Sequence, residues 1–179
     1  FKECWGISLI HCPYCHGFEF RTKKTGILAN GERAFHLASL VSNLTNDLII
    51  LTTGKADFKP EQFAKLEAHR IPIIETEIAA LEHQEGQVKN IVFTNGDREI
   101  FDALYAGFPF KQHSDIPLFL GCELTEQGYI RVNEFQQTTI DGVYACGDNT
   151  SRMRSVAAAV ASGNLAGAMT NAALTKELF

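Results

Sequence analysis

The sequence predicts an α/β protein built on a parallel sheet. A short apolar run at residues 26–29 precedes a glycine, and apolar residues then recur at helical spacing over 32–44. A second apolar run at 47–51 follows and is too short for a helix. Strand, glycine turn, helix and strand in this order form a βαβ unit, whose two strands pair in parallel.

A second helix and strand extend this unit to a βαβαβ core. Residues 60–70 form a short amphipathic pattern that begins with Pro60, where the missing N–H of proline matters least. The apolar run at 71–74 follows it and predicts the third strand.

An antiparallel meander is expected next. Asn95-Gly96-Asp97 is a strong turn signal between two strand patterns. We expect meander strands at 77–83, 88–94 and 99–101, and a further buried strand at 103–108.

The composition of the chain changes at residues 108–117, where two prolines and several polar residues are typical of a linker. The sequence therefore predicts two domains, 1–108 and 109–179. In the second, the apolar run at 143–146 predicts a buried strand, and residues 154–178 predict a long helix of small side chains.

Composition is that of a globular protein, with 45% hydrophobic and 21% charged residues among 179. A net charge of −5 excludes the basic footprint of nucleic-acid binding, and no apolar run reaches the length of a membrane span. Five cysteines, with one close pair, differ from a secreted disulfide framework and favour a cytoplasmic protein. Because the chain starts at Phe1, we expect it to be part of a longer protein.

Cys12 and Cys15 are the strongest candidates for chemistry. In a C-x-x-C pair the first cysteine attacks as a thiolate and the second resolves the mixed disulfide. Pro13 restricts the loop between them, and His11 and His16 are side chains that titrate near neutrality.

Two other interpretations of this segment remain open, a structural disulfide and a zinc site. Cys4, His11, Cys12, Cys15 and His16 could supply four ligands. Structural zinc sites usually take a second ligand pair further along the chain, and none follows Cys15. We therefore rank zinc below redox chemistry.

Ala29-x-Gly31-x-x-Ala34 matches a dinucleotide fingerprint whose first glycine is replaced. In such a motif the glycines allow a tight turn and a close approach to pyrophosphate at a helix N-terminus. Gly31 and Ala34 are therefore candidate cofactor contacts. The alternative is a plain βα turn in which Gly31 allows close packing.

Gly147 and Asp148 follow the predicted strand at 143–146. An acidic residue beyond the carboxyl end of a strand lies where open α/β sheets hold ligands. The alternative is an Asx turn or a helix cap.

These motifs in this order resemble the low-molecular-weight thioredoxin reductases, flavoproteins of the pyridine nucleotide–disulfide class. The C-x-x-C comes before the nucleotide unit, and Gly142–Asp148 followed by Arg154–Ala157 is similar to the family's second FAD motif. The resemblance implies a Rossmann-like nucleotide-binding domain carrying the C-x-x-C at 1–108. It also implies the C-terminal part of a split FAD-binding domain at 109–179.

The resemblance also implies roles for the cysteines. Cys12 would attack the external disulfide or thiol, and Cys15 would exchange electrons with the flavin. His16 stands where the family has an aspartate that acts as general acid. Asp148 would contact the FAD ribityl or phosphate region, and Arg154, Ser155 and Val156 would lie near the flavin pyrimidine edge.

Three features depart from the family. No FAD fingerprint precedes the C-x-x-C, so we expect this chain to be a fragment that holds no FAD by itself. The arginine pair that reads NADPH is missing after Leu51, and Ala29 weakens the fingerprint. Use of NADPH or NADH is therefore in question.

The leading hypothesis is an FAD-dependent thiol–disulfide oxidoreductase that acts on a thioredoxin-like protein or on a small-molecule disulfide or dithiol. An alternative within the same resemblance is a dithiol oxidase that passes electrons to oxygen. A zinc-binding interaction module and a glutaredoxin-like domain, which also uses Cys-Pro-Tyr-Cys, are alternatives from other classes. The family is commonly dimeric, which implies a homodimer.

Overall fold

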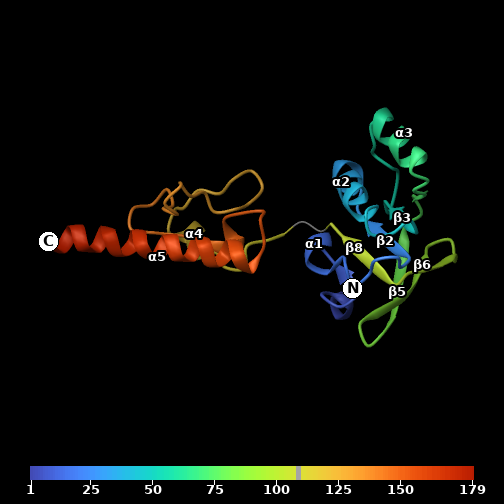
Figure 1. Ribbon diagram of the computed structural model, residues 1–179, viewed down its shortest axis with the longest axis horizontal. Helices are drawn as coiled ribbons and strands as arrows, with labels where there is room; N and C mark the ends of the chain where they lie inside the picture. The colour runs from blue at the N-terminus through green and yellow to red at the C-terminus, as the bar shows by residue number, and fades with distance from the viewer. Residues whose placement is uncertain (108–109) are drawn as a thin grey trace. The chain divides into compact units, whose positions relative to one another are not determined.

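The computed structural model describes residues 1–107 and 110–179 and shows two compact units, Phe1–Phe108 and Pro109–Phe179 (Figure 1). The predicted domain boundary between residues 108 and 109 lies outside the described residues.

A five-stranded sheet forms the centre of the first unit, with strand order β1-β8-β2-β3-β4. Every neighbouring pair in it is parallel, so the predicted α/β class is confirmed. The strands are β1 (Leu9–Ile10), β2 (Thr25–Leu28), β3 (Leu48–Leu51), β4 (Ile73–Ile74) and β8 (Ala103–Ala106).

Alternate residues of these strands build two separate cores, because successive side chains point to opposite faces of a sheet. Ile10, Tyr105, Ile27 and Ile50 form one row across neighbouring strands, and all four are buried. They pack with helices α2 (Gly31–Val41) and α3 (Pro60–Ala68), which Figure 1 shows together on one side of the sheet.

The opposite face is covered by a three-stranded antiparallel sheet of β5 (Ile78–Gln84), β6 (Gln87–Phe93) and β7 (Arg98–Ile100). Val88, Ile91 and Phe93 of β6 pack with Leu28 and Leu51 of the parallel sheet. The meander was predicted from its turn signals. The sequence analysis did not predict that the meander covers the second face of the parallel sheet.

Most predicted elements of the first unit are present, with ends that differ by one to three residues. Helix α2 ends at Val41 rather than 44, and β8 ends at Ala106, while the predicted end of that strand at 108 lies outside the described residues. The C-x-x-C segment, expected as a loop, contains a short helix α1 (Pro13–His16).

The second unit contains α4 (Ile116–Phe119), a 3₁₀ turn η2 (Gly147–Asn149) and the long helix α5 (Val156–Leu178). The predicted strand at 143–146 is wrong. Tyr144 forms only an isolated bridge with Gln137, and residues 143–146 are half-buried. A strand needs neighbours, and the described residues of this unit include none with which it could form a sheet.

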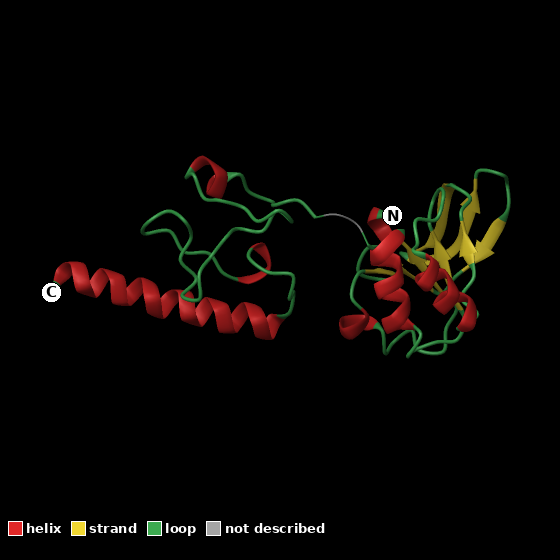
Figure 2. Ribbon diagram, turned by 90° about the horizontal axis from the view of Figure 1, so that it is seen from above, coloured by secondary structure: helices red, strands yellow, loops and turns green. Residues whose placement is uncertain are grey.

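Helix α5 consists mainly of small and apolar residues without a marked polar face, yet it buries only Ala166. In both views the rest of the unit lies along one side of this helix (Figure 1 and Figure 2). Val160 and Leu174 are exposed in this state. A helix that is apolar on all sides is normally buried in a larger structure, so α5 lacks part of its cover here. Among the described residues, no helix is long and apolar enough to cross a membrane.

Substituting Gly26 with alanine is expected to lower the free energy of unfolding by about 1–3 kcal/mol, a typical cost of overpacking. A Cβ on Gly26 would lie 2.6 Å from Cδ2 of Leu104 and 3.1 Å from Cε1 of Phe101. Urea unfolding of the first unit measures the change. As a control, Gly167→Ala in α5 meets no atom within 4 Å and should stabilise its helix by about 0.5–1 kcal/mol. A Gly26→Ala protein as stable as the wild type would contradict this packing.

Candidate active site

The two cysteines of the C-x-x-C segment lie on a single helical turn. Cys12 is the N-cap of α1, and its carbonyl oxygen accepts hydrogen bonds from the amides of Cys15 (3.2 Å) and His16 (3.3 Å). Both cysteines are free thiols, Cys12 partly buried and Cys15 exposed. The turn brings their side chains together, so the Cys15 thiol donates a hydrogen bond to the Cys12 sulfur.

This hydrogen bond makes the pair asymmetric. It is the main cause that raises the pKa of Cys15, and partial burial and the charge of Cys12 add to it. Cys15 therefore keeps its proton at a pH where an ordinary thiol has begun to ionise. Cys15 therefore suits the role of the second, resolving cysteine of a C-x-x-C pair, which leaves Cys12 as the attacking one.

Aromatic residues lie close to the pair in the sequence. Trp5 stacks on His11 with ring centroids 5.9 Å apart, and Tyr14, between the cysteines, is 83% exposed. His16 forms an exposed ion pair with Glu19, at 3.4 Å between Nδ1 and Oε2.

Tyr105 of β8 lies in the core near Cys12 and was not a predicted site residue. Burial, and secondarily the charge of Cys12, raises the pKa of Tyr105 to about 12. No pattern in the sequence marks it, because Tyr105 is read as one apolar residue of a buried strand. Only the register, which pairs it with Ile10 at the end of β1, places it beside the C-x-x-C segment.

The five residues of the zinc interpretation do not assemble. Cys4 is fully buried in the core between the two sheets, and His11 is stacked on Trp5. Within residues 1–107 and 110–179, no group of three or more His, Cys, Asp or Glu side chains could hold a metal ion. The zinc interpretation is therefore not supported.

Gly31 and Ala34 of the degraded fingerprint lie on the first turn of α2. Gly31 has φ +57°, and a Cβ there would lie 3.1 Å from the carbonyl oxygen of Asp57. Ala34 is fully buried against the sheet. The glycine is needed for the close approach of the loop after β3, whereas the alternative interpretation had expected close packing of helix and strand.

The Gly147-Asp148 motif forms an open polar turn on α5. Gly147 has φ +83°, and its amide donates to Oγ of Ser162 at 3.0 Å. Asp148 is exposed and has no ion pair or side-chain hydrogen bond within the described part of the chain, so it is not a helix cap. Oδ1 of Asn149, which sequence reasoning missed, is buried and has no hydrogen-bond partner among the described residues.

Arg154, Ser155 and Val156 lead into α5. Oγ of Ser155 caps the helix by accepting from the amide of Ala158 at 3.1 Å. The Arg154 guanidinium lies 4.7 Å from the centroid of the Phe110 ring. Val156 is 82% exposed. The structure thus gathers the predicted flavin contacts in the second unit and the cysteines in the first.

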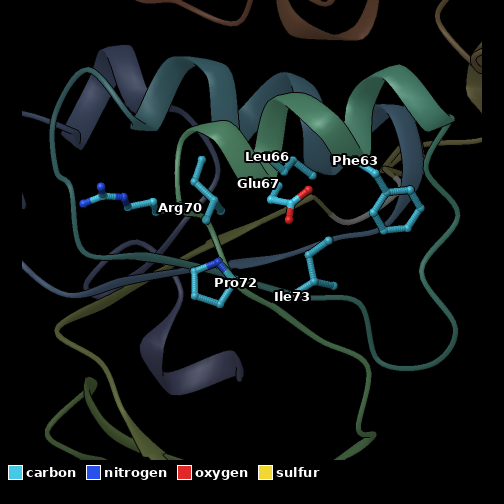
Figure 3. A pocket seen from close by; sticks show the side chains of 7 residues that line it. Phe63, Leu66, Glu67, Arg70, Pro72 and Ile73 are labelled. Carbon is cyan, nitrogen blue, oxygen red and sulfur yellow. The ribbon is translucent and has the colours of Figure 1, made fainter.

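An apolar hollow of about 410 Å³ lies between α3 and β4 (Figure 3). Figure 3 shows Phe63 at one end and Arg70 at the other, with Pro72 and Ile73 beneath. Its lining holds no thiol or histidine, so we place the chemistry at the cysteines instead.

A protein-family model matches most of this chain. The model described as pyridine nucleotide-disulphide oxidoreductase matches residues 31–163, which include the α2 turn and the Gly147-Asp148 motif.

Curated and solved proteins agree with that match. The thioredoxin reductase tcpT of Claviceps purpurea is 31% identical over 99% of this chain and 58% of its own length. The solved structure of TrxB from Bacillus anthracis has a TM-score of 0.90 at 29% identity, over 99% of this chain and 60% of that one. An oxidoreductase from Agrobacterium tumefaciens has a TM-score of 0.86 at 29% identity, over 98% and 59%. The chain thus spans less than two thirds of the length of these relatives.

Proposed function

Because this chain belongs to the pyridine nucleotide-disulphide oxidoreductase family and resembles its thioredoxin reductases, we propose that it forms part of a flavin-dependent thiol–disulfide oxidoreductase. Cys12 and Cys15 would carry electrons between a flavin and an external disulfide or dithiol. The observation that carries the proposal is the pair of accessible free thiols on one helical turn, of which Cys15 has the raised pKa.

The exchange reaction follows from this asymmetry. The Cys12 thiolate attacks one sulfur of the external disulfide, forms a mixed disulfide and releases the first thiolate. Cys15 then loses its proton, attacks the Cys12 sulfur and releases the second thiolate. The Cys12–Cys15 pair ends as a disulfide and two electrons have moved to the substrate. His16, beside Cys15 in sequence, is the group we assign to protonate a leaving thiolate.

The second unit has residues that suit a flavin, which would supply two-electron redox chemistry. The Asp148 carboxylate has no partner within the described residues, and buried Oδ1 of Asn149 lacks a donor. Hydroxyl and amide groups of a cofactor could satisfy both. The exposed apolar surface of α5 also supports residues 109–179 as one part of a larger FAD-binding domain.

Several finer points remain predictions. A thioredoxin-like protein or a small-molecule disulfide or dithiol is the partner we propose, and the homodimer and the cytoplasmic location are expected from the resemblance. The dithiol oxidase alternative uses the same cysteines in the opposite direction, and the relatives named above favour the reductase. The prediction that this chain holds no FAD alone is open to test by flavin absorbance of the purified chain.

The proposed chemistry is tested by treating the reduced chain with one equivalent of an aromatic disulfide. We expect release of two aromatic thiolates per chain and an intramolecular disulfide that peptide mass mapping assigns to Cys12 and Cys15. Cys146, which is half-buried, should remain a thiol in the same digest. A stable adduct on either cysteine, without closure of the pair, would contradict the proposal.

A further inference from the structure

At the carboxyl ends of β2 and β3, hydrogen bonds of Asn30 join the loops that follow the two strands. In open α/β sheets a dinucleotide binds in the crevice at these strand ends, with its pyrophosphate at the N-terminus of the helix that follows the first strand. The family implies a nicotinamide nucleotide at this place. We infer that Asn30 and the loop 52–58 close the crevice, so that this chain does not bind a nicotinamide dinucleotide there.

Asn30 joins the two loops between which an adenosine would have to enter. Its Nδ2 donates to the carbonyl oxygen of Lys55 at 2.8 Å. Its Oδ1 accepts from the amide of Gly31 at 2.8 Å and from the amide of Asp57 at 2.9 Å. The Gly31 amide is one of the helix-start donors that bind pyrophosphate in this fold, and here the chain itself satisfies it.

The loop after β3 also occupies the space. A Cβ on Gly31 would lie 3.1 Å from the Asp57 carbonyl oxygen and 3.8 Å from its carboxylate Oδ2. Pyrophosphate oxygens at this turn would therefore meet a carboxylate of the same sign. A second carboxylate, Glu32, lies in the first turn of α2 and accepts from Nε2 of Gln62 at 2.7 Å.

The residues that would contact the adenosine ribose form hydrogen bonds within their own loop. Oγ1 of Thr52, at the end of β3, donates to the carbonyl oxygen of Gly54 at 2.6 Å. Oγ1 of Thr53 donates to the carbonyl oxygen of Thr52 at 2.7 Å. The end of β3 has no acidic residue that would bind the ribose hydroxyl of NADH. It also has no arginine that would bind the ribose phosphate of NADPH.

The other side of the turn is covered by Arg33. A Cβ built on Gly107, which follows β8, would lie 2.7 Å from Nε and 2.9 Å from Cδ of Arg33. The same Cβ would lie 3.3 Å from Cβ of Ala29. Arg33 thus lies across the end of β8, over which the second half of a dinucleotide would have to pass. Arg33 and the exposed Lys55 and Lys59 are the cations near the turn, and they are the groups through which a dinucleotide would bind if the inference were wrong.

Calorimetric titration of the 179-residue chain with NADPH, and separately with NADH, tests the inference without using activity. We expect no saturable binding up to about 1 mM for the wild type, and at least about tenfold tighter binding for Asn30→Gly, which removes all three bonds. Asn95→Gly, in the turn between β6 and β7, is the matched control and should behave as the wild type.

Two results would overturn the inference. The first is wild-type binding of either nucleotide at micromolar concentration, weakened by Arg33→Ala. The second is a folded Asn30→Gly variant that binds no better than the wild type. If that variant does not fold, amide exchange of the wild type decides the matter. Protection of the Gly31 and Asp57 amides should be unchanged by nucleotide, and a change would overturn the closure. The exchange reaction of Cys12 and Cys15 needs no nucleotide, so its success or failure is scored separately.

Discussion

Replacing Cys12 with serine is expected to lower disulfide turnover by at least about 1,000-fold, because a serine hydroxyl cannot form the mixed disulfide. Cys12 is the first cysteine of the C-x-x-C, which attacks in such pairs, and Cys15, whose pKa is raised, is the resolving one. The measurement is the rate at which the fully reduced protein that contains this chain releases thiolate from a generic disulfide in a single turnover. Cys122→Ser is the matched control, because Cys122 is buried in the other unit, where its sulfur donates a hydrogen bond to Oγ1 of Thr138.

Cys15→Ser should lose activity to a similar extent but leave a different product. With Cys12 intact, the first exchange still occurs, and without Cys15 the mixed disulfide cannot be resolved. Intact-protein mass spectrometry should therefore show a substrate adduct on Cys12 of the Cys15→Ser variant. The Cys12→Ser variant should show no adduct. If the adduct appeared on Cys15 in the Cys12→Ser variant and nothing formed on Cys12, the order of the two cysteines would have to be reversed.

Periodicity predicted the elements of the first unit because its sheet is complete within the described residues. Ile27 and Ile50 pack in the core with the helices on one face, and Leu28 and Leu51 pack in the core with the antiparallel sheet on the other. Residues buried on both faces form continuous apolar runs, which are visible without an alignment. The C-x-x-C pair was equally visible, since its chemistry depends on spacing alone.

The second unit was predicted less well for a physical reason. The run Val143–Cys146 has strand character, but a strand forms only against neighbours, and the described part of this unit offers Tyr144 a single bridge. Long-range contacts could not be predicted from the sequence either. Asn30 resembles an ordinary helix cap in sequence, and only the fold shows that it bonds to Lys55 and Asp57 beyond the next strand.

Alkaline pH should destabilise the first unit through Tyr105. Burial and the nearby charge of Cys12 raise its pKa to about 12 in the folded state, and an unfolded tyrosine titrates near pH 10. Between these values the unfolded chain has released the proton that the folded chain keeps, so unfolding becomes easier as pH rises. The stabilisation is complete below about pH 10 and falls by about 2–3 kcal/mol by pH 12.

Urea unfolding of the wild type and of Tyr105→Phe at several values between pH 9 and pH 12 measures this effect. Lysines and exposed tyrosines also titrate in this range, but they do so in both proteins, so the difference between the two curves isolates residue 105. Phenylalanine keeps the ring that packs among Ile10, Ile27 and Ile50 and removes the ionisable hydroxyl. The wild type should lose stability more steeply than the variant. Parallel curves would show that the phenol of Tyr105 is not buried beside Cys12 in the folded protein.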